Sequence, residues 1–388
     1  MSRQNPAGVF DFWPLPATVT RNEFLYKSLS SWACNISVGC SHACRFCYVP
    51  ATATNRQAKR LRKFHVRNPD SEWGSYSLLR VWDEDKFLGS LRTAQETPPS
   101  ELNPDGNRAV IFCSTTDPFQ VFRGGTVGKS RLLNASARTL VTNALESIRD
   151  HSTLNVRVLT RSPMARGYFD LFKTFGDRLV FGMSVPTLND RMREVYEPKA
   201  PGIQARLKTL KAAKEAGLHV FVAMAPTYPE CDEDDLRQTL LALREFDPIT
   251  VFHEPINIRA ENVARIQERA EQVGVKLKQG VFDDRLTWRQ YALASLTQVQ
   301  RLAEEVGLGH CLHLWPDKEL RSKSYFLKIR QSSREGRPLT RHEQQRHKHN
   351  DIEAYEKEFL PWLHGWWSRV SEWPGQGNRR RVAAAEAH

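Results

Sequence analysis

Hydrophobic residues in the first two thirds of the chain fall into short, continuous runs rich in β-branched side chains. The runs cover residues 32–39, 108–115, 154–161, 178–185, 218–226 and 248–255. Runs of this length and composition are typical of strands that are buried on both faces. Stretches with helical spacing lie between several of them, at 136–151, 205–217 and 232–246. This alternation predicts a parallel sheet, open or closed into a barrel.

The pattern changes after residue 260. Residues 286–307 predict an amphipathic helix, and residues 351–373 predict another that is rich in aromatic side chains and contains Pro361. The Gly-, Arg- and Ala-rich end of the chain predicts disorder. We therefore expect an N-terminal segment (1–29), an α/β domain (30–260), a helical C-terminal extension (261–373) and a basic tail (374–388).

The sequence of 388 residues contains no apolar run long enough for a signal peptide or a membrane span, which predicts a cytoplasmic protein with no membrane partner. Its seven cysteines are an odd number in a long chain, so a disulfide framework is not expected. Reduced thiols are then free to hold a metal.

Three of these cysteines lie in one short stretch, "GCSHACRFCYVP" (39–50), as Cys40, Cys44 and Cys47. The stretch follows the first predicted strand, at the edge of a parallel sheet where ligands bind. A structural zinc site needs four ligands, and no second cysteine pair of suitable spacing occurs. Three thiolates would leave one iron of a 4Fe-4S cluster open to a ligand. Cys34, on the preceding strand, is an alternative fourth ligand.

The stretch "CSHACRFCY" resembles the signature loop of the radical S-adenosylmethionine superfamily. The resemblance implies that Cys40, Cys44 and Cys47 hold a 4Fe-4S cluster and that S-adenosylmethionine binds the fourth iron. It also implies reductive cleavage to a 5'-deoxyadenosyl radical, a partial (β/α)6 barrel and a reducing donor such as flavodoxin or ferredoxin.

Within that superfamily the chain is similar to the DNA repair photolyase-like group, which is related to spore photoproduct lyase. The similarity extends over "NISVGCSHACRFCYVP" and residues 114–120, 159–162 and 182–229. It implies that Arg161 meets the carboxylate of S-adenosylmethionine and that Ser184 faces the ribose. Phe46, Asp117 and Glu197 are further candidates for the same cofactor site.

Cys113 is the candidate for a hydrogen-donating cysteine in that group, but the register places Ser114 at the corresponding position. Neighbouring strand residues face opposite sides of a sheet. We therefore expect Cys113 to point away from the cleft as a small buried side chain, which weakens the case for thymine-dimer repair. Cys231 and Cys311 are expected to be buried in the same way.

The net charge of +12 is unevenly distributed. Residues 51–69 contain no acidic side chain, and residues 318–350 carry ten Lys or Arg against three Glu, a net of 10 − 3 = +7. Such runs are either solvated surfaces or contacts with a polyanion. The candidate nucleic-acid contacts in the first run are Arg56, Lys59, Arg60, Arg62 and Lys63.

Two other patterns carry less weight. The stretch 123–130 fails the phosphate-binding loop spacing because Arg123 stands where glycine is required, so it is expected to lead into a helix. His42 is expected to face solvent, although it could also tune a cluster by hydrogen bonding. Trp362, Trp366 and Trp367 predict a core or interface cluster.

The sequence thus favours a radical S-adenosylmethionine enzyme that acts on nucleic acid, by repair or modification. One alternative is an enzyme of the same chemistry that modifies a peptide or small molecule. A second is a non-catalytic nucleic-acid-binding protein with a structural metal site. Fold alone does not decide between them, since one fold serves many substrates.

Overall fold

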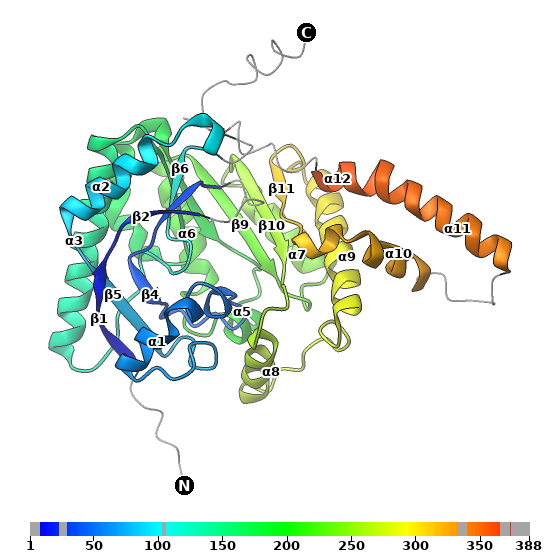
Figure 1. Ribbon diagram of the computed structural model, residues 1–388, viewed down its shortest axis with the longest axis horizontal. Helices are drawn as coiled ribbons and strands as arrows, with labels where there is room; N and C mark the ends of the chain where they lie inside the picture. The colour runs from blue at the N-terminus through cyan, green and yellow to red at the C-terminus, as the bar shows by residue number, and fades with distance from the viewer. Residues whose placement is uncertain (1–7, 23–28, 103–105, 333–339, 365–372, 374–388) are drawn as a thin grey trace, which may run out of the picture.

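The computed structural model describes residues 8–22, 29–102, 106–332, 340–364 and 373, and within these an eight-stranded sheet forms the centre of the molecule (Figure 1). Its strand order is β11-β10-β9-β8-β7-β6-β3-β2, with β2 antiparallel to β3 and the others parallel. The strands are β2 (Val19–Arg21), β3 (Trp32–Cys34), β6 (Ala109–Phe112), β7 (Asn155–Thr160), β8 (Leu179–Ser184), β9 (Val220–Thr227), β10 (Thr250–Pro255) and β11 (Leu312–Leu314).

The predicted fold class is confirmed. Strands β6 to β10 overlap the expected runs, with ends that differ from the expected limits by up to three residues, and they pair in parallel with helices between them. In the described part of the chain the sheet curves without closing, because β2 and β11 remain at its two edges. The architecture is therefore a partial, open α/β barrel.

The first predicted strand, 32–39, is wrong as a single element. Its first half is β3, and its second half is β4 (Ser37–Gly39), which belongs to a separate three-stranded sheet of order β1-β5-β4. That sheet contains β1 (Val9–Pro16) and β5 (Tyr76–Val81). Between the halves, the Asn35 side chain accepts hydrogen bonds from the backbone N–H groups of Ser114 and Thr115 at 3.0 and 2.9 Å. A buried run does not reveal which partner each half pairs with.

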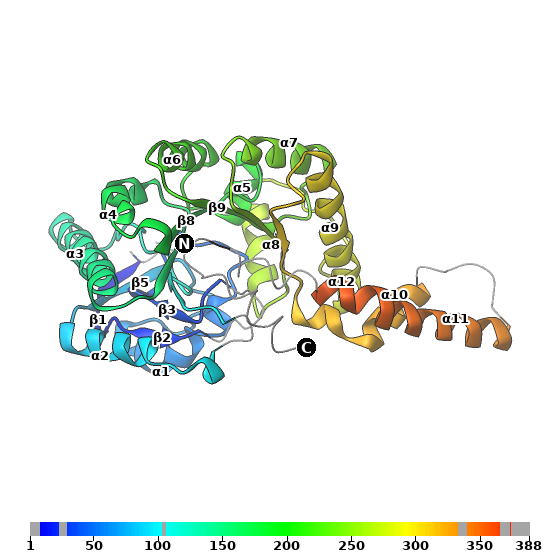
Figure 2. The same cartoon turned by 90° about the horizontal axis from the view of Figure 1, so that it is seen from above.

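Helices cover the outer face of the curved sheet (Figure 2). They are α2 (Glu84–Gln95), α3 (Val127–His151), α4 (Phe169–Lys173), α5 (Asp190–Tyr196), α6 (Ile203–Glu215), α7 (Glu233–Arg244) and α9 (Arg285–Glu305). The start of α3 confirms that stretch 123–130 leads into a helix, since the Thr126 side chain accepts from the backbone N–H of Lys129. The Lys129 ammonium is paired with Asp11 at 2.7 Å.

The inner face of the sheet is packed at the end where the strands begin. Phe221 and Phe252 meet there edge to face, with 5.6 Å between ring centroids. Trp373, from the far end of the chain, inserts against them and is 4% exposed. Its indole Nε1–H donates to the Thr250 hydroxyl at 2.7 Å. This apolar floor leaves the opposite end of the strands for ligands.

Residues after 260 take part in the sheet as well as in helices. Strand β11 pairs with β10, and α8 (Asn262–Gln272) packs near α5. Helices α10 (Lys323–Ser332), α11 (Arg341–Ala354) and α12 (Leu360–His364) project from the body, with a π-helical turn (Tyr355–Phe359) before α12 (Figures 1 and 2). The limits of the expected domains stay a prediction.

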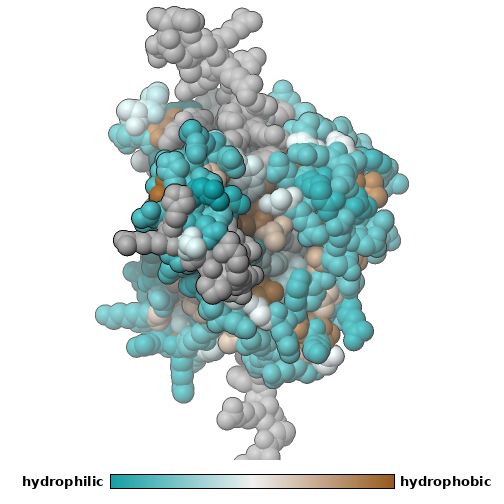
Figure 3. Space-filling view, turned by 90° about the vertical axis from the view of Figure 1, so that its right-hand side faces the viewer, coloured by the Kyte–Doolittle hydropathy of each residue, from teal (hydrophilic) through white to brown (hydrophobic). Residues whose placement is uncertain are grey.

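The projecting helices lie on a mostly hydrophilic face that has hydrophobic residues near its centre (Figure 3). Trp362 is half-buried against Phe359, and its Nε1–H donates to Gln300 at 2.8 Å. Trp366 and Trp367 lie outside the described residues. Among the described helices, none combines the length and apolarity required to cross a bilayer.

Candidate active site

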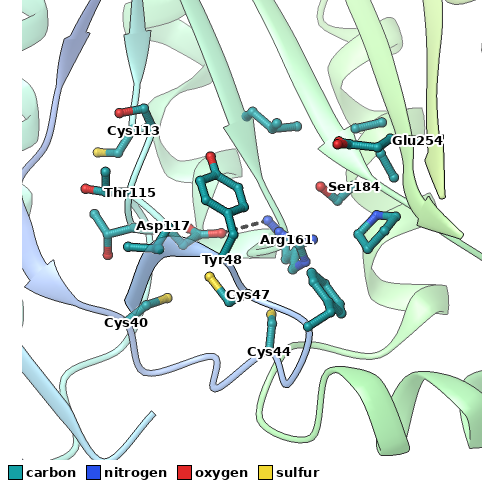
Figure 4. Close-up of a pocket in the computed structure, with 18 of the residues that line it drawn as sticks. Cys40, Cys44, Cys47, Tyr48, Cys113, Thr115, Asp117, Arg161, Ser184 and Glu254 are labelled. Atoms are coloured by element: carbon teal, nitrogen blue, oxygen red, sulfur yellow. Dashed lines mark hydrogen bonds between the residues drawn. The ribbon is translucent and has the colours of Figure 1, made fainter. Parts of the chain in front are cut away.

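A pocket lies at the carboxyl ends of the barrel strands, over the stretch that carries the three cysteines (Figure 4). Cys40 follows β4 directly, Asp117 lies in the loop after β6, and Arg161 is the first residue after β7. Ser184 ends β8. Since parallel strands bring their carboxyl ends to one edge, segments far apart in sequence meet here. The predicted site residues that line the pocket are Cys40, Cys44, Phe46, Cys47, Cys113, Asp117, Arg161 and Ser184.

The three thiols face this shared space. Burial raises the pKa of each of them, to about 12 for Cys47. Neutral thiols do not attract one another, and no group of three His, Cys, Asp or Glu side chains in the described ranges stands close enough to hold a metal ion. The donor set nevertheless suits a soft metal, because thiolates become ligands when a cation displaces their protons.

Asp117 organises the wall above the cysteines. Its carboxylate accepts from the Thr160 hydroxyl at 2.8 Å and from the backbone N–H of Arg161 at 2.8 Å (dashed in Figure 4). His42 Nδ1 lies 3.4 Å from the same carboxylate. His42 is only 5% exposed, so the expectation that it faces solvent is wrong. Burial lowers the pKa of His42, although the Asp117 carboxylate acts in the opposite direction. The lowered pKa favours the neutral imidazole.

Arg161 is held by a buried carboxylate. Its Nε–H donates to Glu197 Oε1 at 2.6 Å, and Arg206 forms a short ion pair with the other oxygen of Glu197. Burial raises the pKa of Glu197, but the two guanidinium groups outweigh it and lower the pKa to about 2. Glu197 is fully buried behind the pocket wall, so its expected contact with a ligand would be indirect, through Arg161.

Aromatic rings flank the Arg161 guanidinium. Its carbon lies 5.6 Å from the centroid of the Phe46 ring, which is next to Cys47 in the sequence. Phe46 is 6.3 Å from Tyr228, and Tyr228 stacks on Tyr196 at 4.0 Å. Cation–π contact and packing limit the positions that the arginine side chain can take.

Cys113 is 6% exposed and packs in the main core, as expected for a small buried side chain, and the residue also borders the pocket (Figure 4). Strand β6 ends at Phe112, so Cys113 and Ser114 lie beyond the alternating part of the chain. The rule that neighbouring residues face opposite sides applies only inside a strand. Both residues therefore line the same cavity.

The remaining cysteines lie elsewhere. Cys34 is fully buried in the main core and does not line the pocket, so its position does not favour the fourth-ligand alternative. Cys311 is buried as expected, whereas Cys231 is only partly buried.

Sequence reasoning missed several residues of the pocket wall. Tyr48 directly follows the last cysteine, and Glu254 lies near the end of a correctly predicted strand, so both positions carried a usable signal. Trp315 follows β11, a three-residue strand that the hydrophobic pattern did not reveal. Its place in the pocket depends on the pairing of β11 with β10.

The basic run after the cysteine stretch folds into short helical turns, with α1 at Ala58–Leu61. Phe64 stacks on Trp13 at 5.7 Å between ring centroids, which fixes the segment against the small sheet. The five candidate nucleic-acid contacts, Arg56, Lys59, Arg60, Arg62 and Lys63, are all exposed. A basic surface therefore lies beside the site.

The second basic run, 318–350, is described only in part. Lys323 and Arg330 on α10 pair with Glu356 at 2.6 Å and Asp351 at 3.5 Å. Two positive charges of this run therefore form ion pairs within the projecting helices.

Comparison with known proteins agrees with this architecture. No family model matches the sequence. An uncharacterized protein of Acidianus two-tailed virus is 29% identical over 260 residues, which cover 66% of this chain and 77% of the viral protein. A substituted form of spore photoproduct lyase aligns with a TM-score of 0.52 at 13% identity, over 79% of this chain and 81% of that one. Another substituted form of spore photoproduct lyase, with bound dinucleoside spore photoproduct, aligns with a TM-score of 0.51 at 13% identity, over 79% of this chain and 80% of that one.

The chain thus has an open α/β fold that solved structures of spore photoproduct lyase share. The particular likeness is to spore photoproduct lyase, and at this identity it concerns the fold.

Proposed function

We propose that this protein is a radical S-adenosylmethionine enzyme that acts on nucleic acid. The observation that carries the proposal is that Cys40, Cys44 and Cys47 line one pocket together with Arg161, an arginine held by a buried carboxylate. This combination offers thiolates for an iron-sulfur cluster and a fixed cation for the carboxylate of a cofactor.

When bound, a 4Fe-4S cluster would supply the electron that splits S-adenosylmethionine into methionine and a 5'-deoxyadenosyl radical. The three thiolates would hold it. Glu197 holds Arg161 through Nε, which leaves the Nη groups to grip the amino-acid carboxylate in two-pronged fashion. Ser184 would face the ribose. A donor such as flavodoxin or ferredoxin would provide the electron.

The proposal is tested by anaerobic reconstitution with iron and sulfide, followed by an assay for 5'-deoxyadenosine under reduction. Replacing Cys40, Cys44 or Cys47 with Ala is expected to abolish the brown absorbance and the cleavage. Cys231→Ala is the matched control, because that thiol lies outside the pocket. If Cys231 proves as essential as the other three, the three-ligand assignment is wrong. If iron binds but S-adenosylmethionine is never cleaved, the result favours the non-catalytic alternative.

The nucleic-acid part of the proposal depends on the exposed basic segment beside the site. A phosphate backbone bound there would release counterions, so affinity would fall with salt by a slope of about −0.9 per phosphate on duplex DNA and about −0.7 on single strands. Neutralising Arg60, Arg62 and Lys63 is expected to reduce the slope by about two to three. Weak binding that barely responds to salt would leave a peptide or small molecule as the substrate class.

The rate of S-adenosylmethionine cleavage gives a second test of substrate class. Cleavage with duplex DNA, single-stranded DNA, RNA or cell extract is compared with cleavage by the enzyme alone. A nucleic-acid substrate is expected to raise the rate. Stimulation by extract that survives nuclease treatment would favour the peptide or small-molecule alternative.

Cys113 is a candidate hydrogen-atom donor in this scheme. Its thiol would give a hydrogen atom to a carbon radical of the substrate and become a thiyl radical. Cys113→Ser is then expected to leave 5'-deoxyadenosine formation intact and to change the fate of the substrate. Unchanged products would exclude the role.

A further inference from the structure

Helix α8 reaches the cysteine loop from more than 200 residues away in the sequence. Asn262, at its first turn, donates from Nδ2 to the backbone carbonyl of Phe46 at 3.2 Å. Arg265, one turn later, donates from Nε to the carbonyl of Arg45 at 3.1 Å and from Nη2 to that of Cys47 at 2.7 Å. Three consecutive carbonyls of the loop therefore point at one helix.

These two side chains are buried. Asn262 is 0% exposed and Arg265 is 3% exposed. Burial lowers the pKa of Arg265 to about 10, with the Cys47 sulfur acting in the opposite direction. A guanidinium is always protonated in proteins, and its Nη2–H donates to the Cys47 carbonyl, so a positive charge lies beside the third cysteine of the motif.

Arg265 also connects the loop to the segment before β5. Its Nη1 donates to the carbonyl of Asp70 at 3.2 Å and forms an ion pair with the Asp70 carboxylate. The other carboxylate oxygen of Asp70 accepts from the backbone N–H of Glu261 at 3.1 Å. Asp70 thus holds the Arg265 side chain and the start of α8 together, while the Nε and Nη2 groups of Arg265 stay on the loop carbonyls.

We propose that Asn262 and Arg265 form a clamp that sets the positions of Cys44 and Cys47 and places a cation beside the iron-sulfur cluster. The inference rests on the proposed function, because it concerns the same three cysteines. The two residues are positioning residues: they contact the backbone of the loop, not a substrate.

The planar guanidinium explains why arginine stands at this position. It offers five N–H donors in a fixed fork, which here span the carbonyls of Arg45, Cys47 and Asp70. Lysine has one ammonium and cannot reach all of them in a fixed geometry. The charge has a second effect, since a nearby cation favours the more negative, reduced form of a cluster and raises its reduction potential.

The experiment compares full-length variants Arg265→Met and Arg265→Lys with wild type. Arg269→Met is the matched control, because Arg269 lies one turn further along α8 and donates to the Glu194 carbonyl at 3.4 Å instead of to the loop. Three quantities are measured: hydrogen exchange of the 44–48 amides in the metal-free protein, iron retained after reconstitution against a chelator, and the reduction potential of the cluster.

We expect Arg265→Met to speed exchange in the loop, to weaken iron retention about 10- to 100-fold, and to make the reduction potential more negative. Arg265→Lys is expected to share the first two effects while keeping a potential near that of wild type, because it retains the charge. Arg269→Met is expected to match wild type in all three measurements.

The outcomes separate this inference from the proposed function. If wild type assembles a cluster and Arg265→Met matches it in exchange and iron retention, the clamp is refuted while the proposed function stands. If wild type assembles no cluster, the proposed function falls and the clamp with it. A global loss of folding is recognised by faster exchange throughout the chain; Arg265→Lys then decides, and loop protection equal to wild type in that variant overturns the clamp.

Discussion

Arg157 and Arg161 show how differently the two ends of the barrel are built. Arg157, within β7, and Arg161, four residues later, both face the inside of the curved sheet. Arg157 lies at the floor, where no carboxylate of the described residues pairs with it, and its guanidinium carbon is 5.1 Å from the ring of Trp373. Burial lowers the pKa of Arg157 to about 9.

Arg161 lies at the pocket end and has the opposite electrostatics. Burial lowers its pKa, but attraction to Glu197 outweighs burial, so its pKa is raised and its charge is secure. Its side chain keeps 19% of its surface exposed, whereas Arg157 has none. The guanidinium of Arg161 is available to a ligand because a carboxylate holds it and part of it stays accessible. The guanidinium of Arg157 instead packs against an aromatic ring.

Removing the Glu197 carboxylate is expected to have the largest effect on the difference between the two ends. Glu197→Gln leaves two guanidinium groups without their counter-charge, and we expect a loss of about 3–5 kcal/mol in the free energy of unfolding. Urea denaturation measures it. The matched control is Glu194→Gln, whose partly exposed pair with Arg193 spans 3.2 Å and should change stability by no more than about 0.5 kcal/mol. Equal effects in the two variants would contradict the assignment.

Removing the floor residue should come next. Trp373→Ala deletes a buried indole that packs on Phe221 and Phe252, and we expect a loss of about 3 kcal/mol in the free energy of unfolding. Because the floor lies at the other end of the strands, iron binding at the cysteines is expected to persist in the folded variant. Loss of iron binding without loss of stability would show that the two ends are coupled.

Acid should weaken the pocket end of the barrel. The pKa of Glu197 is about 2 in the folded protein against 4.5 for the unperturbed group. Between these values the unfolded chain binds more protons, so the contribution of Glu197, about 3 kcal/mol, is present above pH 4.5 and is lost as pH falls toward 2. The free energies of unfolding of wild type and Glu197→Gln, measured by denaturation across this range, should converge at low pH. Parallel curves would refute the shift.

Replacing the floor arginine should have the smallest effect. Arg157→Met removes a buried charge and keeps a long apolar side chain, while it loses the cation–π contact with Trp373. We expect the free energy of unfolding to stay within about 1 kcal/mol of wild type or to rise. A loss above that range would mean that the charge of Arg157 stabilises the floor, and the comparison with Arg161 would fail.

The local pattern predicted the central strands and the cysteine motif because each depends on neighbouring residues. A run such as 218–226 is buried wherever it lies in a parallel sheet, and the spacing of Cys40, Cys44 and Cys47 is a property of the chain itself. Asp117, Arg161 and Ser184 were expected from the family resemblance, and their places after β6, after β7 and at the end of β8 agree with the rule that ligands bind at this edge.

The sequence alone therefore determined the parallel α/β fold, the edge that carries the pocket and the three cysteines that line it. Only the tertiary structure decided that residues 32–39 split between two sheets and that Glu197 stands behind Arg161. It also brought Arg265 to the carbonyls of the cysteine loop. The physical reason is that hydrogen bonds and ion pairs between distant segments depend on which elements pack together, and hydrophobic periodicity records burial but not the identity of the neighbour.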